Sequence, residues 1–314
     1  MTHPLANLGA GSLHEKRPAQ GRDALAKFKT DVVRVAGRLR DVSRDDTLVG
    51  FLAQHLRVLL RFSTARYRLF APAIPKIRTR YTRPYVDLAL SVPARRDIFL
   101  FHHKFILENF QDQTLVELAQ GQVDIWRYKA EGAEYAISMH MDRKVYGEGD
   151  LVLEYFENEV CLFDLAFSIA PGRVVQSQAP SVMMVARLQG RPDRFETIRR
   201  ATKACGDIIP GHLLLAAAEG VAAALAIREI SGIGSDQQVS SRWGFGRFNY
   251  DGFWAELIEE RRDGRYNSVL PIPRKPLADV SKAHRRRTKR KRLFKDAVAA
   301  QTCEALSAHL RRGA

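Results

Sequence analysis

Five short runs rich in β-branched and aromatic residues follow one another between residues 123 and 190. They read VDIWRYKAE, YAISMHMD, DLVLEYFEN, VCLFDLAFSI and SVMMVARLQG, with Gly, Asn or Asp between them. Many of these runs alternate apolar and polar residues, a pattern typical of half-buried strands. The segment EYFENEVCLF indicates a hairpin around Glu157–Glu159. The chain is therefore expected to contain a five-stranded antiparallel meander.

The residues before these strands carry apolar positions at helical spacing. DALAKFKTDVVRVAGRL and DTLVGFLAQHLRVLL each have one apolar stripe, and YVDLALSV and ARRDIFLFHHKFILENF predict two further helices. Residues 1–21 are polar, contain Pro and Gly, and are expected to be flexible. Residues 22–110 are predicted to form a helical region.

After Gly190 helices and strands are mixed. The helix FETIRRATKACG and a long small-residue helix from Gly211 to about Ala226 precede the strand REISGIGS and the short helix YDGFWAELIEER. These elements predict an α+β fold, with a helical N-terminal region followed by a mixed, largely antiparallel sheet with crossover helices. The predicted parts are a flexible N-terminus (1–21), a helical region (22–110), an α+β domain (111–273) and a basic C-terminal tail with a helix (274–314).

The net charge of +15 is concentrated in two segments. Residues 57–83 hold eight Lys/Arg and no Asp/Glu, and residues 274–295 hold eleven Lys/Arg against Asp279 alone. Such clusters attract polyanions such as nucleic acid, anionic lipid headgroups or lipopolysaccharide phosphates. The residues expected to bind an anionic surface are Arg57, Arg61, Arg66, Arg68, Arg285, Arg286, Arg287, Lys289, Arg290, Lys291 and Arg292.

Each basic segment also has a simpler interpretation. In the first, Phe62, Tyr67 and Phe70 either belong to a basic amphipathic surface or pack inward while the arginines face water. The second is either an electrostatic anchor or a solvated tail. It contains no aromatic residue before Phe294, so stacking on bases is poorly supported and nucleic acid is the less favoured partner.

Several classes of protein are disfavoured. No run approaches the roughly 20 apolar residues of a membrane-spanning helix, and the N-terminus lacks a secretory signal pattern. Cys161, Cys205 and Cys303 lie far apart, which disfavours a disulfide framework and fits a reducing cytoplasm. The adjacent His102 and His103 point about 100° apart on a helix, so no metal site is predicted. We expect a cytoplasmic protein, at most peripheral at the inner face of the inner membrane.

Two acidic residues are candidates for acid–base chemistry. Alternation places Glu154 and Asp164 on one face of the sheet if their strands are neighbours. A carboxylate pair in a cleft can transfer protons, although such residues more often face solvent.

The turn after Gln189 and Gly190 is a candidate ligand site. A strand that feeds a helix aims backbone N–H groups at a phosphate, and Lys203 and Arg200 add positive charge. The segment CGDIIPGH does not match the acyl-coenzyme A loop Gln/Arg-x-x-Gly-x-Gly/Ala, because Gly206 and Gly211 are too far apart.

The segments RLQG, ATKACGDIIPGHLLLAAAEGVAAALAI and NYDGFWAE resemble the C-terminal half of the VirK/YbjX family, as does RPYVDLALSVPARRDIFLFHHKF further upstream. The resemblance covers roughly residues 45–295. HHKF stands where the family usually has His-Tyr, and CGDIIPGHLLL replaces a turn similar to Gly-Leu-Arg-Pro-Lys. The turn therefore has less basic character, which weakens a phosphate-binding role for it.

The resemblance implies a bacterial protein of unassigned biochemical activity with an envelope role. Members of the family are linked to virulence, surface-protein placement and resistance to cationic antimicrobial peptides. The strand–loop–helix–strand–helix order after Gln189 is also similar to the cofactor half of GNAT acyltransferases, an analogy of fold rather than of function. The ligand-binding residues expected on this basis are Gln189, Gly190, Lys203, Gly206, Tyr250, Asp251 and Trp254.

Two hypotheses from different classes follow. The first is an acyl- or aminoacyltransferase-like enzyme that uses acyl-coenzyme A or another acyl donor. It requires a cleft where Gln189, Gly190, Lys203 and Trp254 converge with Glu154 or Asp164. The second is a non-catalytic factor that binds an anionic membrane or an envelope partner through the basic segments.

Overall fold

The computed structural model describes residues 48–144, 147–243 and 248–311. Contacts divide the chain into two units, Met1–Gln54 and His55–Ala314, and the features below belong to the second. The predicted flexible N-terminus and the helix expected over residues 23–39 lie outside the described residues. The four-part division of the sequence stays a prediction.

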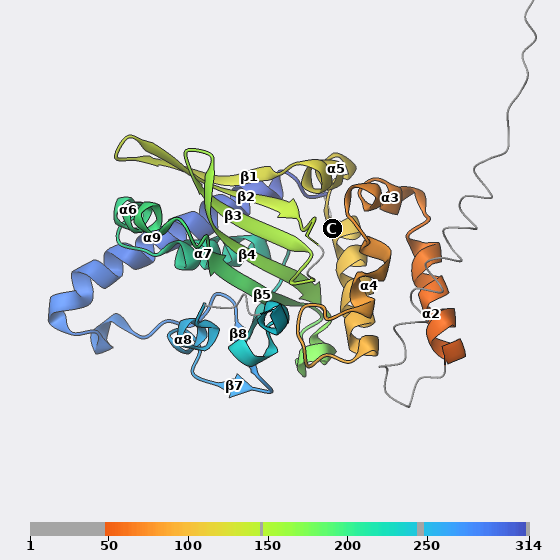
Figure 1. Cartoon of the computed structure of the whole chain (residues 1–314). Coiled ribbons are helices and arrows are strands. Elements are labelled where there is room, and N and C mark those ends of the chain that lie inside the picture. Colours follow the sequence, from red (N-terminus) through yellow and green to blue (C-terminus); the bar gives the residue numbers. More distant parts are fainter. Residues whose placement is uncertain (1–47, 145–146, 244–247, 312–314) are drawn as a thin grey trace, which may run out of the picture. The chain divides into compact units, whose positions relative to one another are not determined.

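The fold is α+β, with helices followed by an eight-stranded, mostly antiparallel sheet (Figure 1). The strand order in the sheet is β1-β2-β3-β4-β5-β6-β8-β7. The strands are β1 (Val123–Ala130), β2 (Ala133–Met141), β3 (Leu151–Glu157), β4 (Val160–Ala170), β5 (Val182–Gly190), β6 (Glu229–Ile233), β7 (Arg261–Arg262) and β8 (Arg265–Val269).

The first five strands form the predicted antiparallel meander, each paired with the next along the chain. The hairpin between β3 and β4 turns at Asn158 and Glu159, whose φ angles of 44° and 67° suit a tight hairpin turn. The short hairpin of β7 and β8 was not predicted, because two paired residues leave no periodic signal.

One pair of neighbouring strands is parallel among those described. Strand β5 pairs with β6 through Met183↔Ile230, Met184↔Ser231 and Val185↔Gly232. A parallel pair needs a crossover connection, and here the chain passes through α6 (Phe195–Ala204) and α7 (Pro210–Ala224). This crossover makes the predicted sheet mixed rather than purely antiparallel.

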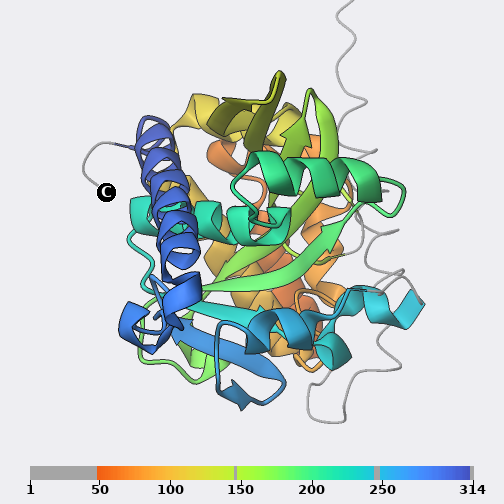
Figure 2. The ribbon, with the colours of Figure 1, turned by 90° about the vertical axis from the view of Figure 1, so that its left-hand side faces the viewer.

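Helices cover both faces of the sheet (Figure 2). On one face lie α6, α7 and the 26-residue α9, and α4 (Val92–Asn109) lies behind the sheet. The remaining helices are α2 (Leu48–Arg61), α3 (Ala65–Arg68), α5 (Asp112–Gln120) and α8 (Tyr250–Ala255). Among the described helices, none is long and apolar enough to cross a membrane.

Two helix predictions need correction. The segment YVDLALSV is not a helix: Val86 has a φ of 62°, and Tyr85 and Asp87 form an isolated bridge. A β-branched residue at positive φ cannot continue a helix. The sequence FKDAVAAQTCEALSAHLRR predicted a helix from Phe294 onward, but α9 (Lys282–Ser307) begins twelve residues earlier, so the basic run is itself helical.

Helix α9 packs closely against α7 at Gly220. A Cβ atom at this position would lie 2.3 Å from the carbonyl oxygen of Ala299 and 2.9 Å from Thr302 Cβ. The C-terminal half of α9 buries Val298, Thr302 and Leu306. The basic segment is therefore anchored to the domain by the second half of its own helix.

We predict that Gly220→Ala destabilises the fold by about 1–3 kcal/mol, because the new methyl group overlaps backbone atoms of α9. Gly211→Ala in the same helix is the control, since its Cβ would meet Phe163 and Phe253 at 3.5 Å, an ordinary contact. Urea unfolding of both variants measures the difference. Equal unfolding midpoints would show that α9 does not pack against Gly220.

Candidate functional site

The structure places Glu154 and Asp164 directly opposite each other on β3 and β4, and Asp164 opposite Gln189 on β5. Neither acidic side chain faces open solvent, because Asp164 is fully buried and Glu154 is 16% exposed. The solvent-facing alternative is therefore wrong for this pair. Their catalytic role stays a prediction.

Arg187 lies beside this pair and is buried to 1% exposure within β5. Its Nε donates to Asp164 Oδ1 at 2.7 Å, and its Nη1 donates to Glu148 Oε2 at 3.3 Å. Burial alone would lower the pKa of Arg187, but Asp164, Asp142 and Glu148 raise it above the usual value. The guanidinium is therefore charged and holds two buried carboxylates together.

Further charged groups surround Glu154. Arg191 Nη2 lies 2.9 Å from Glu154 Oε1 and 3.2 Å from Asp164 Oδ2, and His140 Nε2 lies 3.4 Å from Glu154 Oε2. Burial would raise the pKa of Glu154, but the hydrogen bond from His140 and the charge of Arg191 lower it to about 2. Glu154 is therefore ionised and too weakly basic at neutral pH to be an efficient proton acceptor.

Tyr250 lies at the carboxyl end of β5. Its hydroxyl oxygen accepts hydrogen bonds from the Leu188 backbone N–H at 3.2 Å and from Gln238 Nε2. Both bonds use the oxygen as acceptor, and the hydroxyl proton has no acceptor among the described residues. Burial raises the pKa of Tyr250, so this proton is retained at neutral pH. A phenol proton is thus available beside the strand end.

The other predicted ligand-binding residues do not join Tyr250 in one cleft. Trp254 is buried, with its ring against Gly232, where a Cβ atom would lie 2.1 Å from the indole. Gly190 is packed against Phe163, and Lys203 is exposed in the last turn of α6. The transferase hypothesis required these residues to line one cleft. That expectation is wrong for this set, because Trp254 is a core residue and Lys203 faces water.

Gly206 and Asp251 have local structural roles. Gly206 has a φ of 70° just after α6, with open space where a Cβ would lie. Asp251 Oδ1 accepts from the Ser235 N–H at 3.4 Å and from the Tyr266 hydroxyl at 3.2 Å. Asp251 thus joins the start of α8 to β8 and to the loop that follows β6.

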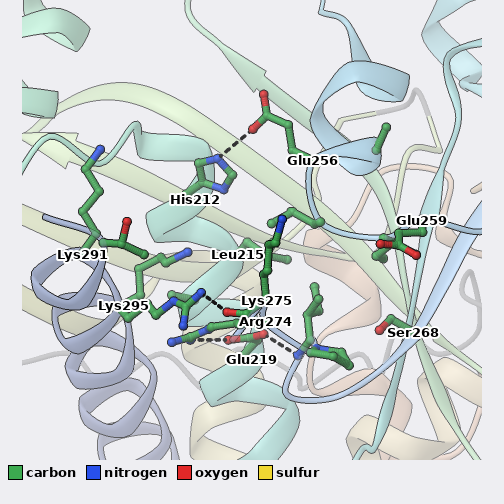
Figure 3. Close-up of a pocket in the computed structure, with 18 of the residues that line it drawn as sticks. His212, Leu215, Glu219, Glu256, Glu259, Ser268, Arg274, Lys275, Lys291 and Lys295 are labelled. Carbon is green, nitrogen blue, oxygen red and sulfur yellow. Dashed lines mark hydrogen bonds and ion pairs between the residues drawn. The ribbon is translucent and has the colours of Figure 1, made fainter. Parts of the chain in front are cut away.

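A cleft of about 980 Å³ opens elsewhere, next to α7 and α9 (Figure 3). None of the predicted ligand-binding residues lines it. Its charged and titratable lining residues are His212, Glu219, Glu256, Glu259, Glu260, Arg274, Lys275, Asp279, Lys291, Arg292 and Lys295. Lys291 and Lys295 share one face of α9, a spacing visible in the sequence, but nothing there indicates that α7 lies opposite.

The first basic segment matches the simpler interpretation. Phe62, Tyr67 and Phe70 are buried, whereas Arg57, Arg61 and Arg68 are exposed. Arg66 is half-buried and pairs with Asp112. This segment therefore offers arginines but no exposed aromatic residues.

The second basic segment forms the exposed first half of α9. Arg285, Arg286, Arg287, Lys289 and Arg290 are exposed, and Lys291 and Arg292 are half-buried. Asp207 pairs with Arg287 at 3.3 Å and with Arg290 at 3.7 Å. One carboxylate therefore pairs with two arginines, and this surface of α9 remains strongly positive in net charge.

No group of three or more His, Cys, Asp or Glu side chains suited to a metal is present in the described parts of the chain. His102 and His103 are buried, and His102 Nδ1 accepts from the Ile169 N–H at 3.1 Å. Burial lowers the pKa of His102 to about 3. Both histidines therefore act as structural side chains.

Residues 52–304 match the family described as "Protein of unknown function (DUF535)". The chain belongs to this family. It is also 23% identical over 240 residues to the Escherichia coli K12 protein named "Uncharacterized protein YbjX", covering 72% of this chain and 71% of that protein. No solved structure matches the chain significantly. The resemblance to VirK/YbjX proteins is thus confirmed.

Replacing Arg187 leaves two buried carboxylates without their counter-ion. We predict that Arg187→Met costs about 3–5 kcal/mol of folding free energy. Arg127→Met is the control, because Arg127 pairs with Asp124 and Glu134 on the surface and its loss leaves stability essentially unchanged. Denaturant unfolding measures both. An Arg187→Met variant as stable as Arg127→Met would contradict this account of the cluster.

Proposed function

We propose that this DUF535 protein is an acyl- or aminoacyl-group transferase whose reaction site lies at the carboxyl ends of β5 and β6. The proposal uses a smaller set of residues than the sequence suggested, centred on Tyr250 and the backbone of Leu188. The observation that carries it is that β5 and β6 stop pairing several residues before β5 itself ends.

Strand β5 extends to Gly190, but its last pair with β6 is Val185↔Gly232. Beyond it, the N–H of Leu188 bonds to Tyr250 instead of to a strand. In open sheets with parallel strands, ligands bind outside the carboxyl ends where neighbouring strands diverge. A strand edge without a partner also suits an extended ligand containing amides, such as the arm of an acyl-coenzyme A.

Tyr250 supplies a hydrogen-bond donor in this proposal. An amine or hydroxyl attacks the carbonyl carbon of a thioester, the carbon–sulfur bond breaks, and the leaving thiolate takes the proton lost by the attacking group. The Tyr250 hydroxyl donates a hydrogen bond to the leaving sulfur and keeps its own proton, because burial raises its pKa. Glu154 orients His140 rather than accepting a proton, because its pKa is about 2.

The proposal requires movement of α8. Tyr250 is only 2% exposed, so a thioester reaches its hydroxyl only if α8 shifts away from β5. Asn249 caps this six-residue helix, and its side chain accepts from the Gly252 N–H at 2.8 Å. This shift also draws the buried Trp254 away from Gly232, so it is a local opening of the core around α8.

We predict that acetyl- or octanoyl-coenzyme A raises the thermal midpoint of the full chain by several degrees, because it binds the folded state. With lysine, glucosamine or glycerol phosphate as acceptor, thiol release should fall about 100-fold in Tyr250→Phe while the thermal shift persists. Tyr266→Phe, which removes the hydroxyl that bonds Asp251, is the control. The absence of both a thermal shift and thiol release for every donor and acceptor would refute the proposal.

A second candidate function is attachment to an anionic membrane surface through α9. Residues 282–295 carry nine Lys/Arg and no Asp/Glu. Among the described residues, Lys282, Arg286 and Lys289 have no ion-pair partner. Cations near a helix N-terminus are unfavourable for the macrodipole, and an anionic surface would offset this cost. Each cation near such a surface contributes about 1 kcal/mol.

We predict that the triple substitution Lys282→Gln, Arg286→Gln and Lys289→Gln weakens binding to phosphatidylglycerol vesicles roughly 100-fold at physiological salt. The control replaces Lys129, Arg173 and Arg262 by Gln, with the same change in net charge. Vesicle sedimentation measures both. Equal weakening would mean that net charge, not α9, drives binding, and absence of binding by the parent chain would exclude this candidate.

A further inference from the structure

The cleft next to α7 and α9 has the size of a small-molecule site, at about 980 Å³. Three segments far apart in the sequence form it: α7, residues 255–260 with 268–279, and α9. Leu215, Ala216, Ile258 and Ile272 contribute apolar lining. The transfer site proposed above uses none of these residues, so the two sites are tested separately.

The lysines of α9 lie on one side of this cleft. Lys291 and Lys295 stand there, with Glu256 and Glu259 on the other side (Figure 3). Glu219, Arg274 and Lys275 lie between them, and Glu256 and Glu259 are exposed. The wall formed by α9 is therefore positive.

Lys295 is the central group of this wall. It is half-buried, and no carboxylate oxygen of a described residue lies within 4 Å of its ammonium. The nearby acids are engaged by Arg274, which lies 2.7 Å from Asp296 and 4.0 Å from Glu219. Burial and the charge of Arg274 lower the pKa of Lys295, whereas Glu219 and Asp296 raise it. A partly desolvated ammonium with no carboxylate in direct contact favours an anionic ligand.

Lys291 adds to the same charge one turn away on α9. Its ammonium donates to the carbonyl oxygen of Asp207 and has no carboxylate within ion-pair distance among the described residues. Burial and the charge of Arg287 lower its pKa. Two neighbouring lysines on one helix face thus lack compensating carboxylates.

The start of α7 presents hydrogen-bonding groups to this wall. His212 is neutral at pH 7, because burial and the charges of Lys295 and Lys291 lower its pKa to about 4. Its buried Nδ1 has no hydrogen-bond partner among the described residues. Among the residues that line the cleft, His212 is the one from the first turn of α7, and its imidazole can form a hydrogen bond with a phosphate.

We propose that this cleft binds a small organic phosphate, with the phosphate against Lys291, Lys295 and His212 and the organic part on the apolar lining. The phosphate replaces the missing counter-ion of Lys295. A free nucleotide and a lipid headgroup both supply this chemistry, and the experiment below separates them.

The test is calorimetric titration of the full chain at 150 mM salt with ADP, with dihexanoyl phosphatidic acid below its micellar concentration, and with adenosine. We expect one of the two phosphates to bind and adenosine not to bind. Binding of ADP identifies a nucleotide-like ligand, and binding of the phosphatidic acid identifies a lipid headgroup. The proposal fails if neither phosphate binds or if adenosine binds equally well.

Two variants locate the binding. Lys295→Met should weaken the phosphate at least tenfold, and Lys295→Arg, which keeps the charge, should bind within about threefold of the parent chain. Lys129→Met makes the same charge change on the exposed surface of β1, outside the cleft, and should also stay within about threefold. Equal weakening by Lys295→Met and Lys129→Met would show general electrostatic attraction and overturn the site. Thermal unfolding verifies that each variant is folded.

Discussion

The contact between Arg187 and its two carboxylates fixes the centre of the sheet. The charge of Arg187 inside the apolar strand β5 is tolerated only because two carboxylates neutralise it. They belong to Asp164 of β4 and to Glu148 of the loop between β2 and β3. Glu148 in turn accepts from the N–H of Ser240, in the segment after β6. One guanidinium thus ties the meander to the crossover half of the fold, at the place where β5 and β6 stop pairing.

A second buried network holds the helical region against the same loop. Arg80 donates to Asp150 at 3.1 Å and to the carbonyl of Asp142 at 2.7 Å, and Tyr85 and Ser168 both bond Asp150. Burial would raise the pKa of Asp150, but its histidine and Arg80 neighbours hold it well below the usual range. The loop between β2 and β3 therefore carries the partners of two buried arginines.

The order of the strands was predictable, whereas the functional surfaces were only partly so. Short alternating runs are local signals, and they identified β1 to β5 and the placement of Glu154 and Asp164 on one face of the sheet. Arg187 was visible as a charge in an apolar run, but its partners come from other elements. The cleft brings together His212, Ile258 and Lys295, and no periodic pattern relates such distant residues. The start of α9 was missed because repulsion among its cations argues against a helix, and packing against α7 outweighs it.

Helix α9 has opposite surroundings at its two ends. Its second half is held by Val298, Thr302 and Leu306 against the domain, and the first half is joined to the domain mainly at Asp207. Packing of the second half thus stabilises the helical conformation of the first half, which repulsion among its closely spaced cations would otherwise oppose. Lys291 and Lys295 lie between the exposed half and the buried half of α9. Both are partly desolvated, and neither has a carboxylate of a described residue in direct contact. An anion bound there would relieve repulsion at the point where the helix leaves the domain, so occupancy of the cleft and binding by the exposed half are expected to be coupled.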